Sequence, residues 1–241
     1  AQVFTWPPVF IPNPVQWKNY PEALTVSRFG RYFLNTAFLS FWVILGNLIS
    51  CTLVAYGFSR IEWKGRDILF IVMLSTLILP DQVTIVPLFI IFKKLDLIGG
   101  GFKGYLPLIL PAWFGRPYYI FLMRQFFLAI PRELSDAARI DGCSELGILG
   151  KIMLPLSKPA LTAVTLFVLI ATWSDFLSPL VYLREADFYT ISVGLANFQD
   201  RYMTQWNQLM AAAAMMVAPV LAIFVIAQRQ FVQGISLTGL K

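Results

Sequence analysis

The chain has 241 residues, of which 58% are hydrophobic and only 13% are charged, and its formal net charge is +6. Soluble domains carry roughly 25% charged residues, so this composition excludes an ordinary water-soluble enzyme and indicates a membrane protein. Histidine is absent, which excludes histidine-based catalysis and histidine-ligated metal sites, and the Lys and Arg residues lie singly between apolar runs rather than in a nucleic-acid-binding stripe.

The amino-terminal segment, residues 1–32, contains five prolines and several aromatic residues. Proline disfavours a helix interior, and aromatic residues concentrate at membrane interfaces. We therefore expect residues 1–32 to form an ordered loop at the membrane surface, on the external side.

Five apolar stretches follow, and each has about the 20 residues that a membrane-spanning helix needs. They are Phe33–Ser59, Ile68–Phe92, Tyr105–Met123, Pro159–Leu183 and Leu209–Gln228. This pattern predicts an all-α polytopic membrane protein with five visible transmembrane helices within residues 33–241. An odd number of spans places the termini on opposite sides, and because chains normally begin inside the cell, we expect a sixth, earlier helix before Ala1.

The sidedness of the chain follows from its positive charges. Ten of the nineteen Lys and Arg residues collect on one side if residues 59–67, 124–158 and 229–241 share it. Several of these ten lie directly at span ends, which favours that side as cytoplasmic.

The segment 131–159, here called the elbow, is the longest polar stretch between two predicted spans. Gly142 can adopt the left-handed conformation that ends a helix, and Ser144 can cap a second helix. Pro155 and Pro159 are expected to stop that helix. The sequence thus predicts two short helices joined by a glycine turn at the membrane surface.

One face of the first elbow helix is expected to carry Leu134, Ala137, Ala138 and Asp141, by their i, i+3, i+4 and i+7 spacing. The small alanines leave room for a partner protein to approach closely. The alternative is an interfacial hairpin that rests on lipid headgroups. A lipid-facing helix would be expected to bury larger apolar residues than alanine, so a docking surface explains the sequence better.

The segments Glu133–Gly142 and Ile152–Pro159 resemble the EAA loop of ABC importer permeases. Asp136 is a departure, since this subgroup commonly has Glu there. The resemblance implies the permease core fold, with residues 124–158 as a cytoplasmic loop that docks into a cleft of a separate ATPase. The residues it assigns to ATPase coupling are Glu133, Asp136, Ala137, Ala138, Asp141, Gly142, Leu154 and Pro155.

Three further segments, Ala55–Arg60, Trp173–Leu180 and Gln230–Gly234, look like the carbohydrate-uptake subgroup of these permeases, the maltose-transporter kind. That resemblance implies six spans and a multi-pass protein of the bacterial or archaeal cytoplasmic membrane. It also implies partners: an ATPase dimer that holds ATP and Mg, a second, non-identical permease and an extracytoplasmic solute-binding protein. No cofactor is expected in this chain itself.

Asp81 and Asp175 are acidic residues inside apolar runs, where a charge costs at least about 2.5 kcal/mol on insertion scales. They are candidates for lining a translocation path, with Trp173 available to stack on a sugar. The alternative is that each carboxylate lies near a helix end and is stabilised locally, which the neighbouring Pro80 and Pro179 favour.

The external loop before the last predicted span is polar and aromatic. It is either a contact for the solute-binding protein or an exposed linker with interfacial aromatic residues. The candidate contact residues are Gln199, Asp200, Arg201, Tyr202 and Trp206.

The function that the sequence favours is the permease subunit of an ATP-driven sugar importer. Gly99–Gly101 lacks the Gly-Lys-Ser/Thr ending of a nucleotide loop, so ATP hydrolysis is expected on another chain. Three alternatives remain: an ion-coupled secondary transporter, an intramembrane enzyme that uses Asp81 and Asp175, and a membrane scaffold without transport.

Overall fold

The computed structural model describes residues 6–7, 14–26, 28–198 and 206–238, and every regular element in this part of the chain is helical. The elements are α1 (Asn19–Val26), α2 (Phe29–Ser59), α3 (Arg66–Ser75), η2 (Thr76–Ile78), α4 (Asp81–Lys94), η3 (Gly101–Tyr105), α5 (Leu106–Ile109), η4 (Leu110–Phe114), α6 (Pro117–Ala129), α7 (Arg132–Ile140), α8 (Glu145–Ile148), η5 (Leu149–Met153), α9 (Leu154–Leu156), α10 (Lys158–Ser174), α11 (Leu177–Tyr182), η6 (Ala186–Phe188), α12 (Ile191–Asn197) and α13 (Trp206–Thr238).

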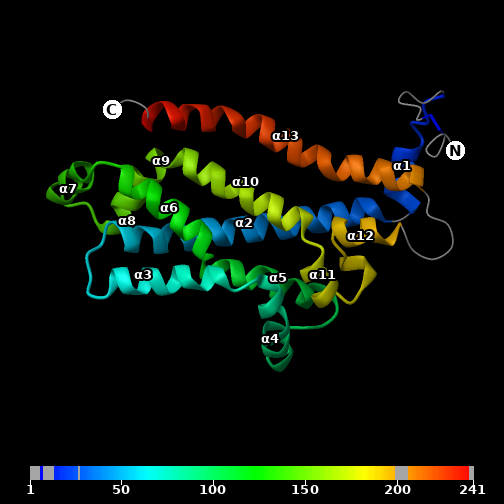
Figure 1. Cartoon of the computed structure of the whole chain (residues 1–241), viewed down its shortest axis with the longest axis horizontal. Coiled ribbons are helices and arrows are strands. Elements are labelled where there is room, and N and C mark those ends of the chain that lie inside the picture. The colour runs from blue at the N-terminus through cyan, green and yellow to red at the C-terminus, as the bar shows by residue number, and fades with distance from the viewer. Residues whose placement is uncertain (1–5, 8–13, 27, 199–205, 239–241) are drawn as a thin grey trace.

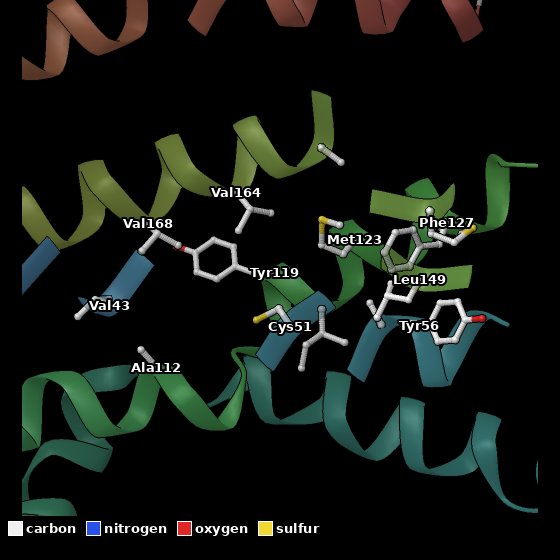
Figure 2. Packing of buried hydrophobic residues seen from close by; sticks show 14 of the residues in the cluster. Val43, Cys51, Tyr56, Ala112, Tyr119, Met123, Phe127, Leu149, Val164 and Val168 are labelled. Atoms are coloured by element: carbon white, nitrogen blue, oxygen red, sulfur yellow. The ribbon is translucent and has the colours of Figure 1, made fainter. Parts of the chain in front are cut away.

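Helix α2 is the central element, and it runs along most of the length of the molecule (Figure 1). The predicted charge-free stretch Phe33–Ser59 lies entirely within it. Helices α6 and α10 and the turn η4 pack against α2, and buried side chains from all four elements meet around it (Figure 2). The α2 side of this core includes Val43, Cys51 and Tyr56.

Two helices in the described part of the chain are long and apolar enough to cross a membrane, α2 and the Trp206–Gln228 part of α13. Two more spans result if bent helix pairs are counted. The helices over Arg66–Ile78 and Asp81–Lys94 meet at 100°, and those over Glu145–Leu156 and Lys158–Ser174 meet at 80°. The structure therefore offers two to four spans, and the count of five stays a prediction.

Three of the five predicted stretches are not continuous helices. The second breaks at Pro80, which is extended (ψ 139°) and therefore starts a new helix rather than continuing the old one. The third breaks at Gly115, whose φ of +80° no helix can contain. The fourth ends at Ser174, because Asp175 is extended (ψ 119°). The prediction of one continuous helix was therefore wrong for these three stretches.

The described parts of the segments predicted to share the cytoplasmic side lie at one end of the molecule (Figure 1). The α2–α3 connection, α7 to α9 and the carboxyl-terminal part of α13 cluster there, and α1 and α12 lie at the opposite end (Figure 1). Which end faces the cytoplasm stays a prediction. Within residues 1–32 the expectation of a loop was wrong for Asn19–Val26, because Pro21 lies in the first turn of α1, where a helix tolerates proline. It was also wrong for residues 29–32, which form the first turn of α2.

Helix α2 approaches η4 closely at Gly46. A Cβ atom at this position would lie 2.7 Å from Cδ1 of Trp113, so only glycine fits. One turn further along α2, Ser50 Oγ donates a hydrogen bond of 3.0 Å to the carbonyl oxygen of Ala112. These contacts fix η4, and with it the broken segment before α6, against the central helix.

We expect Gly46→Ala to destabilise the protein by about 1–3 kcal/mol, because the added methyl group overpacks the contact with Trp113. Gly57→Ala is the matched control, since it lies in the same helix and a Cβ there meets nothing within 4 Å. The measurement is the thermal unfolding midpoint of the detergent-solubilised protein. Equal midpoints for the two variants would contradict the close packing of α2 on η4.

Candidate functional site

The elbow has the glycine turn that its sequence predicts. Helix α7 ends at Ile140, and Gly142 follows with φ +78°. The backbone N–H of Gly142 donates to the carbonyl oxygen of Arg139 at 3.0 Å, and that of Cys143 donates to Ala138 at 2.9 Å. These bonds satisfy the last carbonyl groups of the helix, as left-handed glycine termini commonly do.

The second elbow helix begins at the predicted cap. Ser144 Oγ accepts a hydrogen bond of 3.2 Å from the backbone N–H of Gly147. The helix then passes through the π-helical turn η5 and ends at Leu156, so Pro155 does not stop it. Pro155 lies in α9, which continues directly from η5. Pro159 lies in the first turn of α10, where its missing N–H group needs no partner.

A cluster of hydrogen bonds ties the elbow to the central helix. Glu145 in α8 accepts from the Tyr56 hydroxyl at the end of α2, and from Nε of Arg139 in α7 at 2.7 Å. Arg139 also bonds Oδ1 of Asp136 at 2.7 Å. The bonds from Arg139 and then Tyr56 hold the pKa of Glu145 below its usual range. One carboxylate thus joins three helices.

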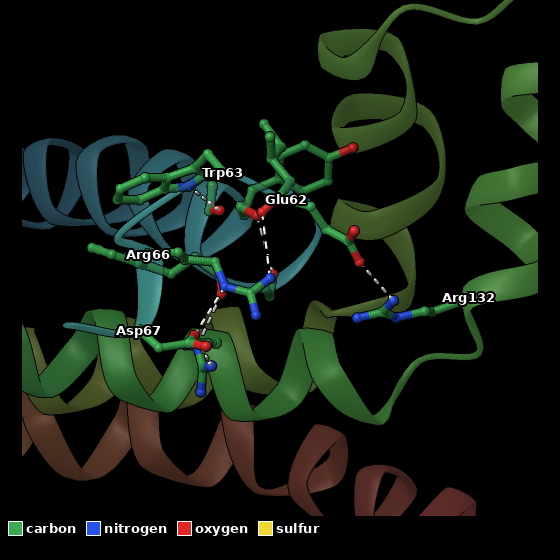
Figure 3. A network of polar contacts seen from close by, with 11 residues as sticks. Glu62, Trp63, Arg66, Asp67 and Arg132 are labelled. Carbon is green, nitrogen blue, oxygen red and sulfur yellow. Dashed lines mark hydrogen bonds and ion pairs between the residues drawn. The ribbon is translucent and has the colours of Figure 1, made fainter. Parts of the chain in front are cut away.

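A second tether runs from Arg60, just past the end of α2, to the end of α6. Arg60 is 8% exposed, and its guanidinium donates to the carbonyl oxygens of Phe127 and Ile130. Glu62 in the α2–α3 connection pairs with Arg132 at the start of α7 at 3.2 Å (Figure 3). That exposed pair contributes little energy, but it places α7 beside the α2–α3 connection.

The residues predicted to contact an ATPase do not all lie on one surface. Glu133, Asp136, Ala137, Asp141, Gly142 and Pro155 are exposed, and Leu154 is half-buried. Ala138 is only 9% exposed and belongs to the buried core cluster of the chain itself. The prediction of a shared exposed face that includes Ala138 was therefore wrong, because Ala138 packs into the buried cluster, to which Ile148 of α8 also belongs.

Sequence reasoning missed two apolar residues of the elbow surface. Ile140 is 87% exposed and Leu146 is 72% exposed, and they flank the glycine turn on either side. Large apolar side chains so accessible at a turn are typical of a surface that a partner covers. The signal was present in the sequence, since both residues interrupt an otherwise polar stretch.

A cavity of about 320 Å³ brings the two intramembrane aspartates together. Asp81, Arg116 and Asp175 all line it, beside residues of α2, α5 and α11. Asp81 is the first residue of α4, and Asp175 Oδ1 accepts a hydrogen bond of 3.2 Å from the backbone N–H of Ser178. Both carboxylates are thus at helix ends, as one alternative proposed, and both line a shared cavity.

Trp173 does not line this cavity. Its side chain is 5% exposed, its Nε1 donates to the carbonyl oxygen of Met216 at 2.9 Å, and its ring meets Phe33 edge-on at 5.2 Å between centroids. The expectation that Trp173 stacks on a solute was wrong for this conformation, because helical spacing turns its side chain toward α13 instead.

The candidate contacts in the external loop lie almost entirely outside the described residues. Gln199, Asp200, Arg201 and Tyr202 fall in the segment 199–205, of which the structure describes nothing. Trp206 is described as the first residue of α13 and is 38% exposed. A contact of this loop with a binding protein stays a prediction.

A family model described as "Binding-protein-dependent transport system inner membrane component" matches residues 49–237. The arabinooligosaccharides transport system permease protein AraQ of Halalkalibacterium halodurans is 35% identical over 97% of this chain and 82% of its own length. The sn-glycerol-3-phosphate transport system permease protein UgpE of Yersinia pestis is 32% identical over 98% of this chain and 85% of its own length.

Two solved structures share the fold. A bacterial ABC transporter for import of the acidic polysaccharide alginate matches with a TM-score of 0.79 and 24% identity, over 92% of this chain and 81% of its own. A bacterial alginate ABC transporter in complex with an alginate pentasaccharide-bound periplasmic protein matches with a TM-score of 0.64 and 16% identity. The match covers 88% of this chain and 81% of the other chain.

We expect Tyr56→Phe and Glu145→Gln to loosen the elbow. Losing a hydrogen bond to this partly exposed carboxylate costs about 1 kcal/mol, which raises the equilibrium constant for local opening of the elbow about fivefold. Backbone hydrogen exchange in α7 and α8 should therefore rise about fivefold at neutral pH. Glu133→Gln, at an exposed position of α7, is the control. Equal exchange in all three variants would contradict the tether.

The same tether should weaken in acid. Because the pKa of Glu145 is lowered in the folded protein, its contribution to stability is present above the ordinary value of 4.5 and is lost as pH falls through the folded value. In the wild-type protein the relative exchange of α7 and α8 should rise only below pH 4.5, and in Glu145→Gln this rise should be absent. A wild-type rise above pH 4.5 would contradict the assignment.

Proposed function

Because the chain belongs to the family of binding-protein-dependent transport system inner membrane components, we propose that it is a permease subunit of an ATP-driven importer of sugars or related carbohydrates. The observation that carries the proposal is the elbow. It presents an exposed glycine turn with two exposed apolar residues, Ile140 and Leu146, and it is hydrogen-bonded to the central helix. The relatives named for arabinooligosaccharide transport support the substrate class.

The partners follow from this role. ATP and Mg are bound by a separate ATPase dimer, whose cleft receives the elbow. A second, non-identical permease completes the membrane pathway in the cytoplasmic membrane of a bacterium or archaeon. An extracytoplasmic solute-binding protein delivers the solute, and the similar alginate transporter in complex with its periplasmic protein supports that arrangement. The external loop with Gln199 to Tyr202 is the proposed contact for it.

The coupling is mechanical. Closure of the ATPase dimer carries the elbow with it, and the contacts of Glu145 and Arg60 pass that displacement to α2 and α6. The membrane helices then exchange between inward-facing and outward-facing states, and docking of the binding protein biases the same equilibrium from outside. In this mechanism Gly142 permits the tight turn, and Glu133, Ala137 and Asp141 contact the ATPase.

The translocation path includes the cavity that Asp81 and Asp175 line. Charged residues within membrane segments commonly mark solute or ion pathways. The same observation favours one alternative function, an ion-coupled secondary transporter, in which these carboxylates bind the coupling ion. Uptake driven by an ion gradient, by this chain without an ATPase, would support that alternative and contradict ATP coupling.

The partner assignment is tested by co-purification. When the complete transporter is solubilised, the ATPase should remain with the permease, and it should be lost when residues 131–159 are replaced by a polar linker of equal length. Retention of the ATPase by the replaced chain would contradict the elbow as its docking site.

We expect Gly142→Val to lower solute uptake per ATP hydrolysed by about tenfold, since a non-glycine residue in the left-handed region costs about 1–2 kcal/mol. Gly142→Asn should retain most coupling, because Asn tolerates this conformation. Gly150→Ala is the matched control, as a Cβ at either glycine meets nothing within 4 Å. Reconstituted vesicles provide both rates.

We expect Ala137→Asp to impair the coupling of ATP hydrolysis to uptake alone, and Ala138→Asp to lower the stability of the protein as well. Ala137 is exposed, so its substitution should uncouple ATP hydrolysis from uptake in a stably folded protein. Ala138 is buried in the core cluster, and an unpaired carboxylate there should lower the thermal unfolding midpoint as well. Wild-type coupling in Ala137→Asp and Gly142→Val together would refute the proposed role of the elbow.

A further inference from the structure

The connection between α2 and α3 forms a recess of about 390 Å³ that lies outside the proposed translocation path. This α2–α3 recess is lined by Glu62, Trp63, Gly65, Arg66, Asp67 and Ile68. It begins just past Ser59, where the long apolar helix α2 ends. Its volume is at the lower end of the range of small-molecule sites, so it suits a compact polar group.

From the recess onward, α3 presents apolar side chains to the outside of the molecule. Ile68, Leu69, Ile71 and Val72 are between 52% and 69% exposed, whereas Phe70 is buried. The ten residues of α3 rise about 15 Å, which is half of the roughly 30 Å hydrocarbon core of a bilayer. This face therefore suits the acyl chains of one leaflet, and the recess at its end lies at the level of the lipid headgroups.

The residues around the recess are typical of a membrane–water interface. Trp63 is 41% exposed, and its Nε1 donates to the carbonyl oxygen of Gly57 at 3.2 Å, which holds the ring at the end of α2. Lys64, the next residue, is exposed. Tryptophan concentrates at membrane interfaces and basic residues flank membrane spans. These features favour a lipid as the occupant of the recess over a second protein chain.

The charged groups of the recess keep free hydrogen-bonding atoms of both kinds (Figure 3). Arg66 uses Nε for Oδ1 of Asp67 at 3.0 Å and Nη1 for the carbonyl oxygen of Ile61 at 3.5 Å. Its Nη2 has no partner among the described residues. Glu62 pairs with Arg132 through Oε1 at 3.2 Å. The second oxygens, Oε2 of Glu62 and Oδ2 of Asp67, also have no partner in the described part of the chain.

The recess thus offers an N–H donor of a guanidinium beside two carboxylate acceptors. A headgroup with a phosphate and a primary ammonium group matches both, because a phosphate accepts charge-assisted hydrogen bonds from a guanidinium and an ammonium donates three hydrogen bonds. Phosphatidylethanolamine has these two groups. Phosphatidylcholine has the phosphate, but its trimethylated nitrogen has no N–H to donate. Phosphatidylglycerol has no positive charge to place beside the carboxylates.

We propose that the α2–α3 recess binds the headgroup of phosphatidylethanolamine, with the phosphate at Arg66 and the ammonium at Glu62 and Asp67. The acyl chains lie along the exposed face of α3. Because Glu62 also pairs with Arg132 at the start of α7, the bound headgroup lies beside the contact between the α2–α3 connection and the elbow. The inference needs only the membrane location of the chain and is independent of ATP-driven import.

The test is native mass spectrometry of the complete transporter complex, titrated in detergent with dioleoyl phosphatidylethanolamine, phosphatidylcholine or phosphatidylglycerol. The wild-type complex should bind the first phosphatidylethanolamine at least about fivefold more tightly than either other lipid, because only this lipid donates hydrogen bonds from a cation to the carboxylates. Equal affinities for the three lipids would overturn the proposal. That result is also the one expected if the second permease covers the recess.

Variants locate the preference. Glu62→Gln combined with Asp67→Asn should reduce the preference for phosphatidylethanolamine over phosphatidylcholine to less than about twofold and leave phosphatidylcholine affinity unchanged, which a misfolded chain would not do. Arg66→Gln should weaken the binding of both lipids about fivefold, because it removes the phosphate contact. Asp96→Asn is the matched control, since this exposed carboxylate pairs with Lys103 outside the recess. An unchanged preference in the double variant would place the lipid elsewhere and refute the site.

Discussion

The hydrogen bonds that Glu145 accepts from Tyr56 and Arg139 join the exposed elbow to the helix around which the other helices pack. Tyr56 lies at the end of α2, and α2 contacts α6, α10 and η4 along its length. A displacement of the elbow therefore cannot stay local, because α7 and α8 move with the end of the central helix or these bonds break. Arg60 makes the connection rigid at a second point, the end of α6.

The helix breaks have a common consequence. In lipid, backbone groups freed by a break need partners within the protein or water in a cavity. The breaks at Pro80, Gly115 and Ser174 lie around one cavity, and each is followed by a charged residue that lines it. The three helix breaks thus bring polar groups together at one place, next to the middle of α2. The cavity and the elbow are connected through the same central helix.

Local features of the fold could be predicted from the sequence. The glycine turn at Gly142 and the cap at Ser144 depend on residues within a few positions of one another, and both are present. Features that depend on distant partners could not. The burial of Ala138 and Trp173 is set by the helices they face, and Tyr56 meets Glu145 across 89 positions of sequence. Hydropathy located the apolar stretches but not the breaks within them, because one glycine or aspartate hardly changes an average over 20 residues.

The central claim is that ATP displaces the elbow and that the hydrogen bonds linking the elbow, α2 and α6 turn this displacement into a rearrangement of the helices around the cavity. The most direct measurement is the distance between nitroxide labels in place of Ile140, in the elbow, and Val86, in α4, in the complete reconstituted transporter. The account predicts that ATP changes this distance distribution in the otherwise wild-type chain, and that Tyr56→Phe reduces the change. A distribution that ATP leaves unaltered, or one that responds equally in Tyr56→Phe, would contradict the account.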